Sequence, residues 1–335
     1  MISRRELMST AAAGSFCLAI PPAIAAAPVD ETGFQRIGGI DQWIAIQGQD
    51  TRNPMILYLH GGPGEAQSPF LKEFLPWQRD FTVVNWDQRG AGKTYGRNGA
   101  STPGMTLDRM VDDVCEVAAY ACGRFSRKKL ILVGQSWGSL LGIHAIKRRP
   151  DLFHAYVGTG QIVSIEASFL DLARFARQKA AETGDQATLD ALNKADALTG
   201  MRRLGAVRRA SSNWAMSAAD LPYTKMLDDF RGKPPYPKGD VADWIAGGSF
   251  SGNTVGFTLP TLDMRTLGLE IPIPFFLVQG RDDHITGLEP ARSYAEEVRA
   301  PAKGFFPIDG GHYACFTNPE AFVGILRKNV CPLAL

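Results

Sequence analysis

The sequence predicts an α/β fold, in which a mostly parallel central sheet is flanked by helices on both faces. Short apolar runs alternate with longer amphipathic segments along most of the chain, as strands and crossover helices do. Several runs are almost continuously apolar and end in glycine or a polar residue, which is typical of strands buried on both faces. The 335 residues are 45% hydrophobic and 21% charged, enough for a large core.

Seven strands and four flanking helices follow from these patterns. The expected strands are the apolar runs over 43–48, 55–62, 81–90, 129–136, 155–160, 275–283 and 304–312. The expected helices have apolar residues at helical spacing over 106–125, 139–153, 289–299 and 318–330.

The alternation stops between about residues 164 and 268. This stretch contains amphipathic helical segments over 169–185, 186–198 and 204–221, and it then becomes rich in proline and glycine. We therefore expect one α/β domain over 28–163 and 269–335, with 164–268 inserted into it as a helical cap.

Residues 1–27 have the pattern of a signal peptide. A short charged start with adjacent Arg4 and Arg5 precedes a moderately apolar stretch and small residues near Ala25. The paired arginines are typical of a twin-arginine export signal, and cleavage after Ala25 or Ala26 is expected. This predicts a periplasmic or secreted protein. A frayed N-terminus on a cytoplasmic protein is the alternative.

The composition also limits the partners. The net charge of +2 comes from 36 basic and 34 acidic residues, and no basic tract with interleaved aromatics is present, so a nucleic-acid partner is not expected. No stretch after residue 27 is apolar for long enough to span a membrane, so no stable anchor is expected after cleavage. No Cys-x-x-Cys or His/Cys cluster indicates a metal, and no cofactor is expected. The oligomeric state is left open.

The cysteines give no clear disulfide. Cys115 and Cys122 lie seven residues apart in one expected helix, about 10 Å along its axis, which is too far for a bridge, so both are expected as buried thiols. Cys315 and Cys331 are free to pair in an oxidising compartment, and the sequence leaves this open.

Residues 134–138 carry the strongest chemical signal. Gly134, Ser136 and Gly138 form a Gly-x-Ser-x-Gly pattern between an apolar strand and an apolar helix. This is the context of a nucleophile elbow, in which the glycines remove side chains that would clash in the tight turn and the serine is exposed at the strand end. Ser136 is therefore the predicted nucleophile, at the positive end of a helix dipole.

A serine nucleophile needs a base and an acid that orients the base. Both are expected after the serine in the chain, at the ends of later strands. Asp282 and Asp283 follow one such strand, and His312 follows the last one. Of the five histidines, His312 alone has both the position and the order.

An oxyanion hole requires two backbone N–H groups directed at the developing negative charge. The residue after the serine, Trp137, supplies one. The loop His60–Gly64, which follows an early strand, supplies the other through Gly62, and a cis bond before Pro63 is one way to hold this loop in shape.

Five segments together resemble the proline iminopeptidase group of α/β-hydrolases. They are HGGPG at 60–64, NWDQRGAGKT at 85–94, GQSWGS at 134–139, GRDD at 280–283 and GGH at 310–312. In that group the acid stands three residues after the strand-end glycine, which selects Asp283. The resemblance implies release of N-terminal residues from short peptides without a metal, and a structural charged pair in the segment 87–90.

The chain departs from this group where the substrate amine is recognised. The glutamates of the family cap have no counterpart here, since Asn213-Trp214-Ala215 lacks the acid that should follow the tryptophan. Glu166, Trp214 and Asp220 are the substrate-binding candidates. Asp228 and Asp229 are further options, and a solvated helix face is the alternative for each acid.

Three functions remain open. The first is an exopeptidase or amidase that resembles proline iminopeptidase and acts on a short peptide or other small molecule. The second is an esterase or lactonase with the same three catalytic groups, favoured by the missing amine site. The third is a non-catalytic binding protein on the same fold, which the complete set Ser136, Asp283 and His312 opposes.

Overall fold

The computed structural model describes residues 27–232, 237–256 and 262–334. One sheet of eight strands runs through the centre in the order β1-β2-β4-β3-β5-β6-β7-β8. The pairs β1–β2 and β2–β4 are antiparallel, and every later pair is parallel. The strands are β1 Val29–Ile37, β2 Ile40–Gly48, β3 Met55–Leu59, β4 Thr82–Trp86, β5 Leu130–Gln135, β6 Phe153–Thr159, β7 Phe275–Gly280 and β8 Lys303–Ile308. The predicted mostly parallel sheet is confirmed.

The edge strand β1 is absent from the sequence-based prediction, which begins the sheet at residue 43. Its sequence, VDETGFQRI, is polar, and most of its residues are exposed or half-buried. Only Val29 and Ile37 at its two ends are buried. Pairing with β2 along its whole length holds it in place, so backbone hydrogen bonds rather than apolar burial make it a strand.

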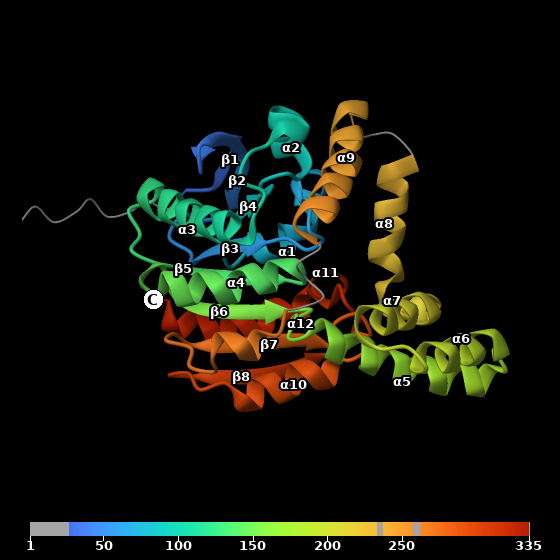
Figure 1. The fold of residues 1–335 in the computed structure, drawn as a ribbon. Helices are drawn as coiled ribbons and strands as arrows, with labels where there is room; N and C mark the ends of the chain where they lie inside the picture. The colour runs from blue at the N-terminus through green and yellow to red at the C-terminus, as the bar shows by residue number, and fades with distance from the viewer. Residues whose placement is uncertain (1–26, 233–236, 257–261, 335) are drawn as a thin grey trace, which may run out of the picture.

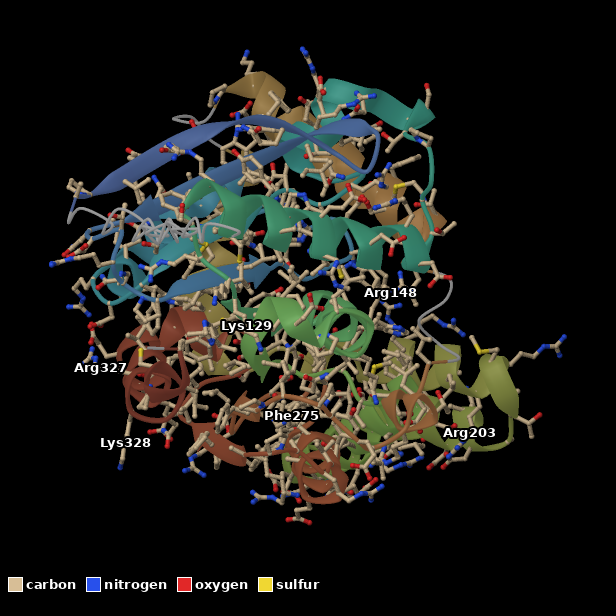
Figure 2. The ribbon with its side chains drawn as sticks, turned by 90° about the vertical axis from the view of Figure 1, so that its left-hand side faces the viewer. Lys129, Arg148, Arg203, Phe275, Arg327 and Lys328 are labelled. Atoms are coloured by element: carbon tan, nitrogen blue, oxygen red, sulfur yellow. The ribbon has the colours of Figure 1, made fainter. Side chains whose placement is uncertain are left out.

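Helices cover both faces of the sheet (Figure 1). Helices α3, α4 and α10 pack on one face in one apolar core, and α1, α11 and α12 pack on the other in a second. Their bounds are α1 Leu75–Gln78, α2 Gly92–Asn98, α3 Leu107–Arg124, α4 Trp137–Arg148, α10 Leu288–Glu297, α11 Ala314–Thr317 and α12 Pro319–Ile325. Figure 2 shows Phe275 inside these layers, where it is fully buried, and Arg327 and Lys328 at the periphery.

The segment between β6 and β7 is helical, as its apolar spacing indicates. It contains α5 Ile165–Thr183, α6 Gln186–Asp196, α7 Gly200–Ser211, α8 Leu221–Gly232 and α9 Lys238–Thr254. We call this segment the insertion. The glycine-rich stretch 246–253 belongs to α9, which lies beside α2 (Figure 1). Helices α5, α6 and α7 enclose a small apolar core of their own.

Two further expectations concern the termini and the cysteines. The predicted signal peptide lies, apart from Ala27, outside the described residues. Within the part of the chain that the structure describes, no helix is both long and apolar enough to cross a membrane. Cys115 and Cys122 are buried free thiols, as expected, and Cys315 and Cys331 are also free rather than paired.

Candidate active site

Ser136 occupies the sharp turn between β5 and α4. Its backbone has φ 52° and ψ −120°, a conformation that residues with a side chain rarely adopt. Its N–H donates to the carbonyl of Thr159 at the end of β6, over 3.1 Å. The serine itself is half-buried, whereas Gln135 and Trp137 on either side are fully buried. The strand-turn-helix geometry thus presents the Ser136 side chain at the carboxyl edge of the sheet.

The two glycines of the elbow are required by close backbone approach. A Cβ atom on Gly134 would lie 2.6 Å from the carbonyl oxygen of Gly138. A Cβ on Gly138 would lie 2.0 Å from the carbonyl oxygen of Leu59. A side chain at position 134 would collide with the backbone of Gly138, and one at position 138 would collide with the end of β3. The requirement for glycine on both sides of Ser136 therefore has a direct steric basis.

His312 and Asp283 form a buried pair at the same edge of the sheet. The Nδ1 atom of His312 lies 3.2 and 3.1 Å from the two carboxylate oxygens of Asp283. Asp282, in contrast, is exposed. The ring of His312 also lies against Gly160, the residue after Thr159, which accepts the hydrogen bond from Ser136. The structure therefore brings the predicted acid and base together beside the elbow.

The carboxylate of Asp283 is fully engaged by its surroundings. It accepts from the N–H groups of Ile285 and Thr286, the Thr286 hydroxyl and the Gln279 side chain. Burial would raise the pKa of Asp283, but His312 and these donors outweigh burial and lower it. Burial likewise disfavours the charged ring of His312, yet Asp283, Asp220 and Glu65 nearby raise its pKa above the ordinary value. An imidazolium at position 312 is thus stabilised by its neighbours.

The loop that carries Gly62 packs directly against the elbow. A Cβ on Gly61 would lie 3.2 Å from the Cβ of Ser136, so Gly62, its neighbour, is also close to the serine. Gly62 has φ 113°, a glycine conformation, and its bond to Pro63 is cis. Trp137 begins α4, and N–H groups in the first turn of a helix have no acceptor within the helix. The two predicted oxyanion donors therefore lie on adjoining segments.

His60 and Gln88 connect this loop to the elbow. Burial lowers the pKa of His60 to about 4, so its ring is neutral at physiological pH. Its Nδ1–H donates to Gly61 and its Nε2 accepts from the N–H of Gln88. The Gln88 side chain donates to the His60 carbonyl and accepts from the indole N–H of Trp137. The ring of His60 is thus used for structure.

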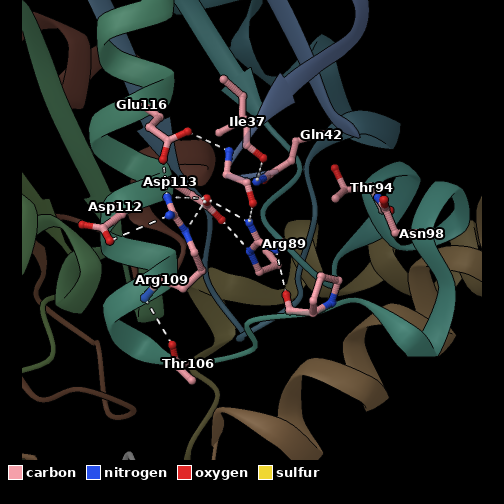
Figure 3. Close-up of polar contacts among 12 residues, drawn as sticks. Ile37, Gln42, Arg89, Thr94, Asn98, Thr106, Arg109, Asp112, Asp113 and Glu116 are labelled. Carbon is pink, nitrogen blue, oxygen red and sulfur yellow. Dashed lines mark hydrogen bonds and ion pairs between the residues drawn. The ribbon is translucent and has the colours of Figure 1, made fainter. Parts of the chain in front are cut away.

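The charged pair expected in the segment 87–90 is Arg89 with Asp113 of α3 (Figure 3). Arg89 Nε and Nη2 lie 2.7 and 3.0 Å from the two Asp113 oxygens, and both side chains are almost fully buried. Arg89 also donates to the carbonyls of Pro103 and Gly38. A buried pair with such complete hydrogen bonding fixes β4 relative to α3 and to the β1–β2 turn.

The chain is similar in sequence to a known protein family and to several known proteins. Residues 54–319 match the model of the α/β-hydrolase fold family. The chain belongs to this family. It is 29% identical over 314 residues to a probable aminopeptidase, YbaC, of Bacillus subtilis, covering 88% of this chain and 94% of that one. A proline iminopeptidase of Clostridioides difficile is 25% identical over 49% of this chain and 54% of its own.

Solved structures agree with this α/β-hydrolase in fold. The proline iminopeptidase of Mycobacterium smegmatis superposes with a TM-score of 0.63 at 19% identity, over 91% of this chain and 99% of that one. An esterase of Thermogutta terrifontis gives a TM-score of 0.59 at 15% identity, over 91% and 100%. The fold class and the resemblance to proline iminopeptidases inferred from the motifs are confirmed.

Asp220, a predicted substrate ligand, has protein partners instead. It is fully buried in the α/β-hydrolase and accepts from the backbone N–H groups of His312 and Tyr313, at 3.0 and 2.9 Å. The hydroxyl of Ser217 donates to the same carboxylate. The partners are 92 and 93 residues away in sequence, so no local pattern could have indicated them.

The other predicted substrate ligands lie elsewhere in the insertion. Glu166 is exposed in the first turn of α5. Trp214 packs against the small core of α5, α6 and α7. Asp228 and Asp229 are exposed on α8. The structure therefore groups none of these four side chains with the His312–Asp283 pair.

Glu65 is a carboxylate of the site that the motif analysis did not single out, because it stands one residue beyond HGGPG. Its Oε1 accepts from the hydroxyl of Tyr313, and its Oε2 would lie 3.3 Å from a Cβ on Gly61, close to Ser136. Burial raises the pKa of Glu65, opposed by His312, Tyr313 and Arg231. Glu65, Arg231 and Trp244 line a cavity of about 390 Å³ beside the Gly62 loop.

Proposed function

We propose that this α/β-hydrolase is an exported serine hydrolase that releases the N-terminal residue from short peptide-like substrates. The observation that carries the proposal is the strained turn at Ser136 beside the buried His312–Asp283 pair. A half-buried serine in a strained turn, next to an imidazole held by a carboxylate, is the arrangement that activates a hydroxyl for attack on a carbonyl.

The proposed mechanism uses each group once in acylation and once in deacylation. His312 removes the proton of Ser136 as the serine oxygen attacks the carbonyl carbon, while Asp283 fixes the ring and stabilises its charged form. The N–H groups of Gly62 and Trp137 bind the tetrahedral oxyanion. His312 then protonates the leaving amine, and the acyl-enzyme is hydrolysed by water that His312 activates in turn.

The charges around the cavity support a peptide-like substrate. Glu65 lines the cavity next to the Gly62 loop, and in the proposed complex its carboxylate receives a cationic amine on the acyl group. Arg231 lines the same cavity and lies over the Trp244 ring, 5.1 Å from its centroid. Opposite charges on one cavity suit a short peptide, which carries an amine and a carboxylate. The aminopeptidase and iminopeptidase names of the relatives agree with this.

A carboxylesterase or lactonase is the second candidate. It is favoured by the absence of an acid after Trp214, where the family has one, and it would use Ser136, His312 and Asp283 in the same way. Esters need no protonation of an amine leaving group, so they make smaller demands on the site.

A substrate panel separates the two functions. Proline and alanine arylamides, their N-acetylated forms and short aryl esters are assayed with the wild type and with Ser136→Ala. The proposal expects turnover of the free-amine arylamides, weak or no turnover after acetylation, and loss of all activity in Ser136→Ala. Turnover of esters alone would reject the peptidase and favour the esterase. A fluorophosphonate that labels a residue other than Ser136 would reject both.

Export is proposed from the sequence of residues 1–27 and has its own test. Replacing Arg4 and Arg5 with lysine should retain the protein in the cytoplasm of a host with twin-arginine transport, because the paired arginines are the recognised feature. Cell fractionation and the N-terminal mass of the mature protein give the result. Unchanged export of the lysine variant would contradict this route.

A further inference from the structure

The insertion holds the backbone of the proposed base through one buried carboxylate. Asp220 stands just before α8, and its two oxygens accept from the consecutive N–H groups of His312 and Tyr313. One turn further on, Tyr223 stacks on the ring of Tyr313 with centroids 4.0 Å apart. The insertion therefore contacts the segment 312–313 by hydrogen bonding and by ring stacking, at residues three apart in sequence.

The contact is closely fitted on both sides. A Cβ on Gly311 would lie 2.0 Å from the Asp220 carboxylate, so the glycine before His312 leaves the space that the acid fills. Ser217 donates to Asp220 from within the insertion, over 3.1 Å. Burying a carboxylate is costly unless donors surround it, and here two backbone N–H groups and one hydroxyl do so.

We propose that Asp220 is a positioning residue for His312: it fixes the base beside Ser136 and adds negative charge that stabilises the imidazolium formed during turnover. The inference rests on the proposed serine hydrolase function and extends it, because it makes the insertion a part of the proton-transfer apparatus. Asp220 does not touch the substrate and acts only through His312.

The charges that face His312 come from three separate segments. Asp283 approaches from the end of β7, Glu65 from the Gly62 loop and Asp220 from the insertion, and all three raise the pKa of the ring against the effect of burial. Removing the charge at 220 while Asp283 and Glu65 remain should therefore lower that pKa partly. A residue with a merely structural role would reduce the amount of active protein without moving the pKa.

The test follows Ser136 phosphonylation by a fluorophosphonate against pH, which needs no natural substrate. For Asp220→Asn we expect the plateau rate to fall about 10–100-fold, because one backbone N–H loses its acceptor. The half-maximal pH should also move down, by about one unit. Asp229→Asn, an exposed charge removal on α8, is the matched control and should behave as the wild type. Labelling stoichiometry normalises each rate to active sites.

Ser217→Ala is the milder second variant if Asp220→Asn does not fold. It removes one donor to Asp220 and keeps the charge, so the plateau should fall severalfold while the half-maximal pH stays in place. The proposal would be overturned if Asp220→Asn showed the wild-type plateau rate of phosphonylation and the wild-type half-maximal pH. If only Ser217→Ala folds, a wild-type plateau rate in that variant would overturn the proposal. Failure of the proposed function is distinct, because the wild type would then not be labelled at Ser136.

Discussion

At the scale of single residues, the neighbours Asp282 and Asp283 have opposite environments. Asp283 is buried against His312, and Asp282 is exposed. The sequence alone offered both acids, and only family spacing selected one. Asp220 shows the limit of sequence reasoning. Its acidic character and its place in the insertion suggested a substrate ligand, but its carboxylate accepts hydrogen bonds from backbone N–H groups 92 and 93 residues away in sequence.

Replacing Asp283 and Asp282 separately with asparagine gives a matched pair of variants. Asp283→Asn should reduce kcat by about 10⁴-fold, because the amide no longer fixes the ring tautomer or stabilises the imidazolium. Asp282→Asn should retain the wild-type rate. Arylamide or ester turnover, with circular dichroism to verify folding, measures both. Equal losses in the two variants would contradict the assignment of Asp283.

The pH dependence follows from the raised pKa of His312. In the proposed mechanism only the neutral ring accepts the serine proton, so we expect activity to be lost as the pH falls through this pKa. Because the neighbouring carboxylates place it above the ordinary histidine value of about 6.5, the acid limb should lie above that pH. Fluorophosphonate labelling rates between pH 5 and 9 show the limb. A half-maximal rate below pH 6 would mean that burial dominates.

At the scale of elements, the elbow depends on close contact between β3 and the start of α4. Gly138→Ala places a methyl group 2.0 Å from the Leu59 carbonyl, so we expect a loss of about 3 kcal/mol or more in the free energy of unfolding. Gly123→Ala in α3 is the control: it meets no atom within 4 Å and should be neutral or stabilise by up to about 1 kcal/mol. Urea unfolding measures both, and similar values for the two would refute the steric argument.

The buried ion pair of Arg89 and Asp113 connects the segment after β4 to α3. Asp113→Asn leaves a buried guanidinium without its charged partner and should cost about 3–5 kcal/mol in the free energy of unfolding. Glu270→Gln, which breaks an exposed ion pair with Arg299, should cost less than about 1 kcal/mol. Thermal and urea unfolding decide between them. A loss below 1 kcal/mol for Asp113→Asn would show that solvent reaches the pair.

The elements differ in how well they could be predicted from their sequences. The strands of the central sheet were predictable because they are buried on both faces and therefore mostly apolar. Strand β1 was not, since a polar edge strand has no such pattern and depends on its partner β2. Helix α9 contains Gly247 and Gly248, which weaken its helical signal, and Gly247 lies against the backbone of Gly90 and Gly92.

At the scale of the whole molecule, the four cysteines within the described residues report on global opening. Cys115, Cys122 and Cys315 are buried and Cys331 is half-buried, and burial raises the pKa of each thiol, to about 11 for Cys115 and Cys122. A thiol reagent should therefore modify Cys331 first and the other three only on unfolding. Mass mapping of labelled peptides shows the order. Early modification of Cys315 would reveal local opening beside the site. If oxidation protected both Cys315 and Cys331 from the thiol reagent, the two residues would form a disulfide.

The insertion and the sheet share the site through several separate contacts. Besides Asp220, Trp244 donates to the Ala66 carbonyl, Ser251 donates to the Gly90 carbonyl, and Lys93 pairs with Asp240. These contacts join α9 to the loops that follow β3 and β4 and to helix α2. The sequence predicted that the insertion is helical, but these contacts join residues far apart in the chain and became visible only in the fold.

The crossing of Gly280 and Gly311 has a consequence for engineering this enzyme. A methyl group at 280 would overlap the carbonyl oxygen of Gly311, and one at 311 would overlap Asp220, so three chain segments meet with no spare volume. Libraries designed to alter substrate preference should leave these two glycines unvaried and diversify the rim of the cavity beside the Gly62 loop, at positions such as Ile245, which is 46% exposed.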